Sequence, residues 1–160
     1  MTSAPASKTP APKTKWLVGD EARAWRNYIE ATTMLLDALD HQLQRDAKMP
    51  HGYYEILVRL SDVPERTMRM SELADATRSS RSRLSHAVTR LEERGWVQRE
   101  DCETDRRGQL ARLTEAGMQA LTEAAPGHVA AVREHLIDRL TPEQVTQLAD
   151  IAESVVAGLS

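Results

Sequence analysis

Arginine supplies all of the formal positive charge between residues 78 and 112 of this 160-residue chain. The guanidinium group forms forked hydrogen bonds with phosphate oxygens and base edges, so the chemistry that this segment favours is nucleic-acid binding. Six acidic residues accompany the arginines and leave a local charge of +3, although the whole chain carries −3. A solvated face of salt bridges explains a charge run equally well. The arginines are Arg78, Arg81, Arg83, Arg90, Arg94, Arg99, Arg106, Arg107 and Arg112.

The spacing of the apolar residues places part of this charge on one face of a helix. A narrow apolar stripe is formed by Leu84, Ala87, Val88 and Leu91. The opposite face is rich in short hydroxyl side chains with arginines at its edges, a composition that suits a DNA major groove. A solvated surface helix, the alternative, more typically carries Glu/Lys pairs. The predicted DNA-binding residues here are Arg78, Ser79, Ser80, Arg81, Ser82, Arg83, Ser85, His86, Thr89 and Arg90.

Short elements before and after this face are predicted to position it. A short helix with Ser71 as its N-cap precedes the arginine-bearing helix, which is capped by Ser79 or Ser80. Gly95 is expected to end that second helix as a C′ glycine, with Trp96 folding back on it. The segments WVQRE and QLARL then alternate as two strands joined by a polar loop. The order is helix, tight turn, helix, hairpin.

Long helices are predicted on both sides of this unit. One covers residues 20–46, a second runs from its Thr114 cap through Leu140 with a kink at Pro126, and the last starts at residues 141–144. Their apolar stripes are larger than a centre of about 65 residues could cover, and such stripes are usually buried against a second copy. We therefore expect a homodimer.

The run LSHAVTRLEERGWVQRE…DRRGQLARLTEAG closely resembles the MarR family of bacterial transcriptional regulators. The resemblance extends from about residue 20 to the end of the chain, and the LT-E-A-G motif matches residues 113–117. It implies a mainly α fold with a small β-hairpin wing, which combines a winged helix-turn-helix DNA-binding lobe with a helical dimerisation region. In that family the second helix of the motif reads the major groove and the wing reaches the adjacent minor groove.

The family's Asp-x-Arg wing motif matches Asp105 and Arg107. An arginine at a hairpin tip can enter a narrow minor groove, where the negative potential is focused. Asp105 is placed to hold the guanidinium of Arg107 extended. The residues themselves do not decide which arginine enters the groove. Family spacing favours Arg107 and leaves Arg106 for a phosphate.

The resemblance implies a homodimeric, sequence-specific DNA-binding transcriptional regulator, a repressor of a pseudo-palindromic operator on double-stranded DNA. The alternatives are an architectural DNA-binding protein without a sensing function and a winged-helix protein–protein interaction module. The expected organisation is a disordered tail over residues 1–17, a dimerisation helix over 18–47, the winged helix-turn-helix DNA-binding domain over 48–113 and dimerisation helices over 114–160.

Relatives often bind a small aromatic or lipophilic effector between the dimerisation helices and the DNA-binding lobe. The resemblance therefore implies a ligand site at which five residues are candidates, although aromatic residues at helical spacing more often serve the core. The candidates are Trp25, Tyr28, His51, Tyr53 and Tyr54.

Other chemistry is not expected. The five histidines lack paired metal-ligand spacing, no acid pairs with a nucleophile, and no glycine-rich phosphate loop occurs, so neither a metal, a cofactor nor enzyme activity is predicted. Cys102 is a bystander, because cysteine-based sensors in this family use the first long helix, where this chain has none. A single cysteine fits a reducing cytoplasm, and no apolar run approaches the roughly 18 residues of a membrane span.

Overall fold

The computed structural model describes residues 14–101 and 108–159. It divides the chain into two compact units, Met1–Thr33 and Met34–Ser160. Helix α1, Gly19–Ala47, passes through the boundary between them and agrees with the helix predicted over 20–46. Of the tail predicted over residues 1–17, residues 1–13 lie outside the described part, and residues 14–18 form no helix or strand.

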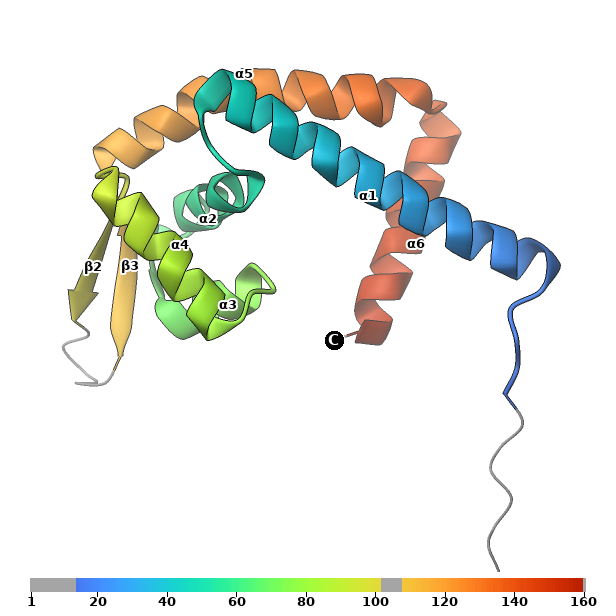
Figure 1. The fold of residues 1–160 in the computed structure, drawn as a ribbon, viewed down its shortest axis with the longest axis horizontal. Helices are drawn as coiled ribbons and strands as arrows, with labels where there is room; N and C mark the ends of the chain where they lie inside the picture. Colours follow the sequence, from blue (N-terminus) through green and yellow to red (C-terminus); the bar gives the residue numbers. More distant parts are fainter. Residues whose placement is uncertain (1–13, 102–107, 160) are drawn as a thin grey trace, which may run out of the picture. The chain divides into compact units, whose positions relative to one another are not determined.

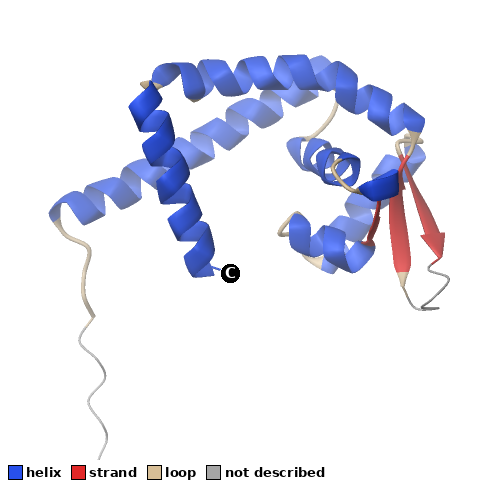
Figure 2. Ribbon diagram, turned by 180° about the vertical axis from the view of Figure 1, so that it is seen from behind, coloured by secondary structure: helices blue, strands red, loops and turns tan. Residues whose placement is uncertain are grey.

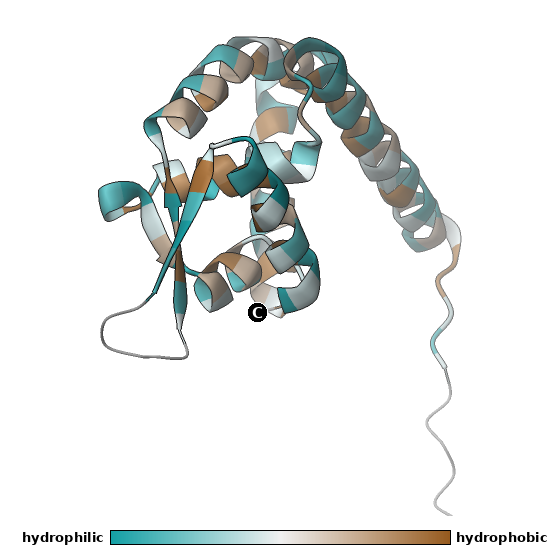
Figure 3. Cartoon of the chain, turned by 60° about the vertical axis from the view of Figure 1, so that its left-hand side comes forward, coloured by the Kyte–Doolittle hydropathy of each residue, from teal (hydrophilic) through white to brown (hydrophobic). Residues whose placement is uncertain are grey.

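Polar and apolar positions alternate along α1 (Figure 3). In the first unit the large apolar side chains stay exposed, at 56% for Trp25 and 53% for Tyr28. In the second unit the helix buries Leu39 and Leu43. The two parts of the helix therefore differ in how much apolar surface they leave uncovered.

The second unit is mainly helical with one small sheet (Figure 1). This arrangement confirms the predicted fold class of α-helices with a small β wing. After α1 its elements are α2 (His51–Ser61), η1 (Pro64–Arg66), β1 (Thr67–Arg69), α3 (Met70–Ala76), α4 (Arg81–Glu93), β2 (Val97–Asp101), β3 (Gln109–Leu113), α5 (Glu115–His135), η2 (Ile137–Arg139) and α6 (Pro142–Leu159).

The predicted hairpin is present, and a third strand joins it. β2 and β3 pair antiparallel from Val97↔Leu113 to Asp101↔Gln109. β1, which the sequence pattern did not indicate, pairs with β3 and gives the order β1-β3-β2 (Figure 2). Three residues are too few to show an alternating pattern, so β1 exists only through its pairing with a strand that lies far along the chain.

One hydrophobic cluster holds the helix-turn-helix and the hairpin together. The apolar stripe predicted on α4 is buried, with Leu84 at 1% exposure and Val88 and Leu91 at 0%. It packs in the same cluster as α2, α3 and the inner faces of β2 and β3. The outer face of α4 is consequently the one left for solvent or a partner.

The caps at both ends of α4 follow the predicted chemistry. Ser80, rather than Ser79, is the N-cap, and its hydroxyl accepts a hydrogen bond from the Arg83 amide at 3.3 Å. Gly95 has a φ of +70°. Its amide binds the Glu92 carbonyl at 2.8 Å, and the Trp96 amide binds the Leu91 carbonyl at 3.0 Å. These two bonds form the Schellman motif expected of a C′ glycine.

Two predicted boundaries are wrong. Ser71 is not the N-cap of α3: the chain passes directly from β1 into the helix, so Arg69, with extended φ and ψ, occupies that position. The helix after Thr114 ends at His135 rather than Leu140, because Leu136 leaves helical geometry and η2 follows. Pro126 lies inside α5, which continues past it.

The start of α5 packs closely against the end of α4. The Thr114 hydroxyl caps the Gly117 amide at 3.0 Å and donates to the Gly95 carbonyl at 2.6 Å. A Cβ on Gly117 would lie 2.1 Å from the Trp96 carbonyl oxygen. Only glycine permits this approach, which fixes where the hairpin leaves the helices.

The last helix begins as its sequence predicts and leaves its apolar face uncovered. The Thr141 amide donates to the Gln144 side chain at 2.9 Å and the Gln144 amide to the Thr141 hydroxyl at 3.3 Å, a reciprocal capping box. No residue of α6 is buried. Within the described residues, no helix is long and apolar enough to cross a membrane.

Candidate nucleic-acid interface

The turn between α3 and α4 sets the direction of α4. The buried Thr77 hydroxyl donates to the Leu73 carbonyl at 2.8 Å, and the Ser79 amide donates to the Ala74 carbonyl at 2.9 Å. Arg78 takes a left-handed φ of +50° between them. With its backbone groups paired in this way, the turn carries α4 away from α3 and leaves one long side of α4 open.

The open side of α4 carries the side chains that helical periodicity predicted for it. Seven of the predicted DNA-binding residues are exposed on this helix, and Arg78 is exposed in the turn. Ser79 differs, because it is half-buried and its hydroxyl contacts the Thr77 carbonyl at 3.4 Å. Ser80 serves as the cap. The seven residues are Arg81, Ser82, Arg83, Ser85, His86, Thr89 and Arg90.

Ion pairing separates the arginines of this region into two groups. Towards the C-terminal end of α4, Arg90 binds Glu93 at 2.8 Å and Arg99 binds Glu92 at 2.7 Å. Arg78, Arg81 and Arg83 form no ion pair or side-chain hydrogen bond with any described residue. Their charge therefore adds to the positive end of the helix dipole at the N-terminus of α4.

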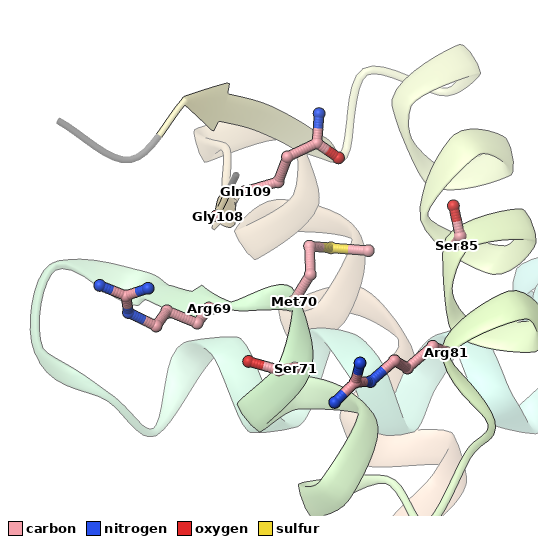
Figure 4. A pocket seen from close by; sticks show the side chains of 7 residues that line it. All are labelled: Arg69, Met70, Ser71, Arg81, Ser85, Gly108 and Gln109. Atoms are coloured by element: carbon pink, nitrogen blue, oxygen red, sulfur yellow. The ribbon is translucent and has the colours of Figure 1, made fainter. Parts of the chain in front are cut away.

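A polar groove of about 380 Å³ lies between the start of α3, the start of α4 and the base of the wing (Figure 4). Only two of its residues, Arg81 and Ser85, were predicted as site residues. The others come from β1 and β3 and the residues next to them, and the sequence holds no local signal for that pairing. The groove is lined by Arg69, Met70, Ser71, Arg81, Ser85, Gly108 and Gln109.

Arg99 is another residue that the predicted set omitted. It lies on β2, and its guanidinium reaches α4 to contact Ser85, Thr89 and Glu92 at distances of 2.7–3.3 Å. Alternation along β2 indicates only which face of the strand it occupies. The contact itself depends on how the hairpin packs against α4.

The tip of the wing lies outside the described residues. Asp105, Arg106 and Arg107, together with Cys102, belong to residues 102–107. Their predicted roles stay predictions. β2 and β3 are described up to Asp101 and from Gln109, so the base of the wing is defined on both strands.

The three candidate ligand residues of the second unit divide between two places. His51 and Tyr54 line a pocket of about 300 Å³ together with His128, whose ring centroid lies 5.7 and 4.4 Å from theirs. Burial, and then the nearby His51, lower the pKa of His128. Tyr53 lies elsewhere, with its ring centroid 5.8 Å from the Arg94 guanidinium carbon.

Trp25 and Tyr28, the remaining candidates, belong to the first unit, where both are more than half exposed. No group of three or more His, Cys, Asp or Glu side chains that could hold a metal occurs in the described part of the chain.

Comparison with known proteins places this geometry in one family. The MarR family model matches residues 48–108. The crystal structure of Sco3205, a MarR family transcriptional regulator from Streptomyces coelicolor in complex with DNA, is 56% identical over 92% of each chain with a TM-score of 0.88. That of AbsC, a MarR family transcriptional regulator from the same organism, is 45% identical over 91% of this chain and 98% of AbsC, with a TM-score of 0.86.

A more distant relative, the transcriptional repressor MprA of Escherichia coli (strain K12), is 30% identical over 103 residues. The match covers 64% of this chain and 58% of that relative, which is less than two thirds of its length. The long match to Sco3205 at 56% identity, together with the helix-turn-helix, hairpin and capped outer helices, settles the assignment: this chain belongs to the MarR family of transcriptional regulators.

Proposed function

We propose that the chain is a homodimeric, sequence-specific DNA-binding transcriptional repressor that acts at a pseudo-palindromic operator. The observation that carries the proposal is the exposed side of α4, where Arg81 and Arg83 have no described partner beside a row of short hydroxyl side chains. This composition suits a major groove, in which arginine forks onto guanine. The 56% identical relative Sco3205 was crystallised in complex with DNA, which supports the same partner for this chain.

The proposed contacts divide by element. α4 enters the major groove with its N-terminal residues foremost, as recognition helices of this motif do. Arg107 enters the adjacent minor groove at the wing tip, Asp105 holds its fork extended, and Arg106 binds a phosphate. Residues 48–113 thus form the DNA-binding domain, and residues 18–47 and 114–160 serve dimerisation.

Uncovered apolar side chains support the dimer. On α6, Ile151 is 59% exposed, Val155 46%, Val156 55% and Leu159 80%. Contiguous apolar surface of this kind usually marks an interface. A second copy of the chain would place two copies of α4 about one helical turn of DNA, roughly 34–36 Å, apart.

The pocket beside His51, Tyr54 and His128 is where we place an effector of the small lipophilic or aromatic class. Its lining combines aromatic rings with Val58 and with the Arg59 guanidinium, which lies 3.9 Å from the Glu55 carboxylate, so a largely apolar ligand would fit it. Binding there would release repression by changing the separation of the two α4 helices.

A competition experiment tests the proposal. The dimer is bound to a duplex selected from a randomised library and challenged with a second duplex of scrambled sequence at physiological salt. A sequence-specific regulator keeps the selected duplex against about a 1,000-fold excess of the scrambled one. Equal competition by both would instead indicate an architectural DNA-binding protein. Failure to bind any duplex at low salt would favour a protein–protein interaction module.

A further inference from the structure

We infer that Arg99 sets the hydrogen-bonding direction of the hydroxyl groups on the exposed side of α4. In this role it leaves Ser85 to act as a donor towards DNA and removes the Thr89 hydroxyl from base recognition. Arg99 then determines sequence preference without touching DNA. The inference rests on the proposed function, since it concerns what α4 reads.

The Arg99 guanidinium is held in one orientation. Its Nη1 donates to Glu92 Oε2 at 2.7 Å and to Thr89 Oγ1 at 3.1 Å. Its Nη2 donates to the Ser85 carbonyl at 2.7 Å and to Ser85 Oγ at 3.3 Å. The four Nη hydrogens thus have four acceptors. The side chain is only 21% exposed, so water does not compete freely for these positions.

The Thr89 hydroxyl faces Arg99 rather than a base. Its own hydrogen goes to the Ser85 carbonyl at 3.0 Å, and its oxygen lies 3.1 Å from both Nη1 and Nη2 of Arg99. The donor of this hydroxyl is therefore used. Its oxygen accepts from Nη1, and Nη2, whose two hydrogens are shared with Ser85, covers the second lone pair. The group that exposed Thr89 can still present to a groove is its methyl, which suits the methyl of thymine.

The Ser85 hydroxyl, in contrast to that of Thr89, still has a hydrogen to donate. Its oxygen accepts from Arg99, while no described residue accepts its hydrogen. It is exposed and lines the polar groove beside Arg81 (Figure 4). Because the Arg99 guanidinium lies at the Ser85 oxygen, the hydroxyl hydrogen of Ser85 points away from Arg99. A donor group of a base that approached the same oxygen would meet the positive charge of the guanidinium.

The consequence is that one position of the recognised DNA site has to offer a hydrogen-bond acceptor. The hydroxyl of an unconstrained serine can bond to donors and acceptors alike. The Ser85 hydroxyl can only donate, so it bonds only to acceptor atoms of the bases, namely purine N7, guanine O6 or thymine O4. It discriminates against the amino groups of cytosine and adenine. Lysine could not replace Arg99, because an ammonium lacks the planar fork that spans Ser85 and Glu92 together.

The test compares selections from a randomised duplex library with the full-length dimer. Ser85→Ala and Arg99→Met should each lose about three- to ten-fold discrimination at the same base pair of each half-site, the range of one neutral hydrogen bond. Thr89→Val keeps the methyl and removes the hydroxyl, so it should retain the wild-type preference. The Ser85→Ala/Arg99→Met double variant should lose no more than either single variant.

The outcomes separate the inference from the proposed function. If the wild type selects no sequence, the proposed function fails and the inference falls with it. Two outcomes overturn only the inference. In the first, Arg99→Met preserves the motif that the wild type selects. In the second, Thr89→Val loses the preference at the base pair where Ser85→Ala keeps it. Should Arg99→Met fail to fold, the contrast between Ser85→Ala and Thr89→Val decides whether the inference holds. Arg99→Lys then tests the loss of the Arg99 fork with the positive charge retained.

Discussion

The carboxylate of Glu92 in α4 accepts two hydrogen bonds from Arg99 in β2, one from its backbone amide at 3.0 Å and one from its guanidinium at 2.7 Å. The two side chains are 30% and 21% exposed. One pair of residues thereby joins the proposed recognition helix to the wing. Because both partners are largely withdrawn from water, this contact is stronger than a surface ion pair.

Glu92→Gln should therefore lower the free energy of unfolding by about 1–2 kcal/mol, since it weakens a charged hydrogen bond at a partly buried site. Urea unfolding at fixed protein concentration measures the change. Glu93→Gln, which breaks the exposed pair with Arg90 on the same helix, is the matched control and should leave the unfolding midpoint unchanged. Equal midpoint shifts for the two variants would contradict the assignment.

Gly117→Ala should destabilise the protein by at least about 2 kcal/mol, because the added methyl would overlap the Trp96 carbonyl, 2.1 Å away. Gly52→Ala in α2 meets no atom within 4 Å and should stabilise it by about 0.5–1 kcal/mol. Thermal unfolding of both variants at the same concentration gives the comparison. A Gly117→Ala protein as stable as wild type would show that α5 can move away from the start of β2.

The unpaired arginines should dominate the salt dependence of DNA binding. Arg83→Ala is expected to lower the slope of log K against log salt by about 0.9 for each phosphate that this side chain neutralises, once per protomer. The double variant Glu55→Ala/Arg59→Ala removes a paired charge of each sign on α2, outside the predicted DNA-binding residues, and should leave the slope unchanged. Binding titrations over a range of salt test both, and equal slopes for Arg83→Ala and wild type would refute phosphate binding by that residue.

Protonation of His128 should destabilise the fold. Burial and the adjacent His51 lower its pKa below the ordinary value of 6.5. As the pH falls through about 6.5, the unfolded chain therefore binds a proton before the folded protein does, and the free energy of unfolding decreases. Above that pH His128 is neutral in both the folded and the unfolded protein, and the free energy of unfolding is not lowered by this residue.

Urea unfolding at pH 7.5 and 5.5 measures the effect, and His128→Asn should reduce the difference between the two pH values. His135→Asn replaces an exposed imidazole on the same helix and serves as the control. A pH dependence as steep in His128→Asn as in wild type would assign the effect to other groups.

The dimer should depend on the apolar face of α6. Ile151→Asp would bury an unpaired carboxylate in each half of the interface, so the dissociation constant of the dimer should rise more than about 100-fold. Thr146→Asp introduces the same charge on an exposed polar position of α6 as a control. Sedimentation velocity distinguishes monomer from dimer, and an intact Ile151→Asp dimer would place the interface elsewhere.

The sequence by itself determined those features whose causes lie within a few residues. The buried stripe of α4 follows from helical periodicity, and the caps at Ser80, Thr114 and Thr141 follow from side chains that bind amides three residues on. The family was also recognisable, because its motifs combine in a fixed order. These signals are local, so they can be interpreted from the sequence without any knowledge of the packing.

Tertiary structure alone decided the composition of the site. β1 exists because Thr67 pairs with Arg112, and it brings Arg69 to the groove beside Arg81. Arg99 reaches Thr89 only because the hairpin packs on α4. Hydrogen bonds across such separations depend on the relative positions of whole elements, which burial of the common core sets, and no short window of residues encodes that.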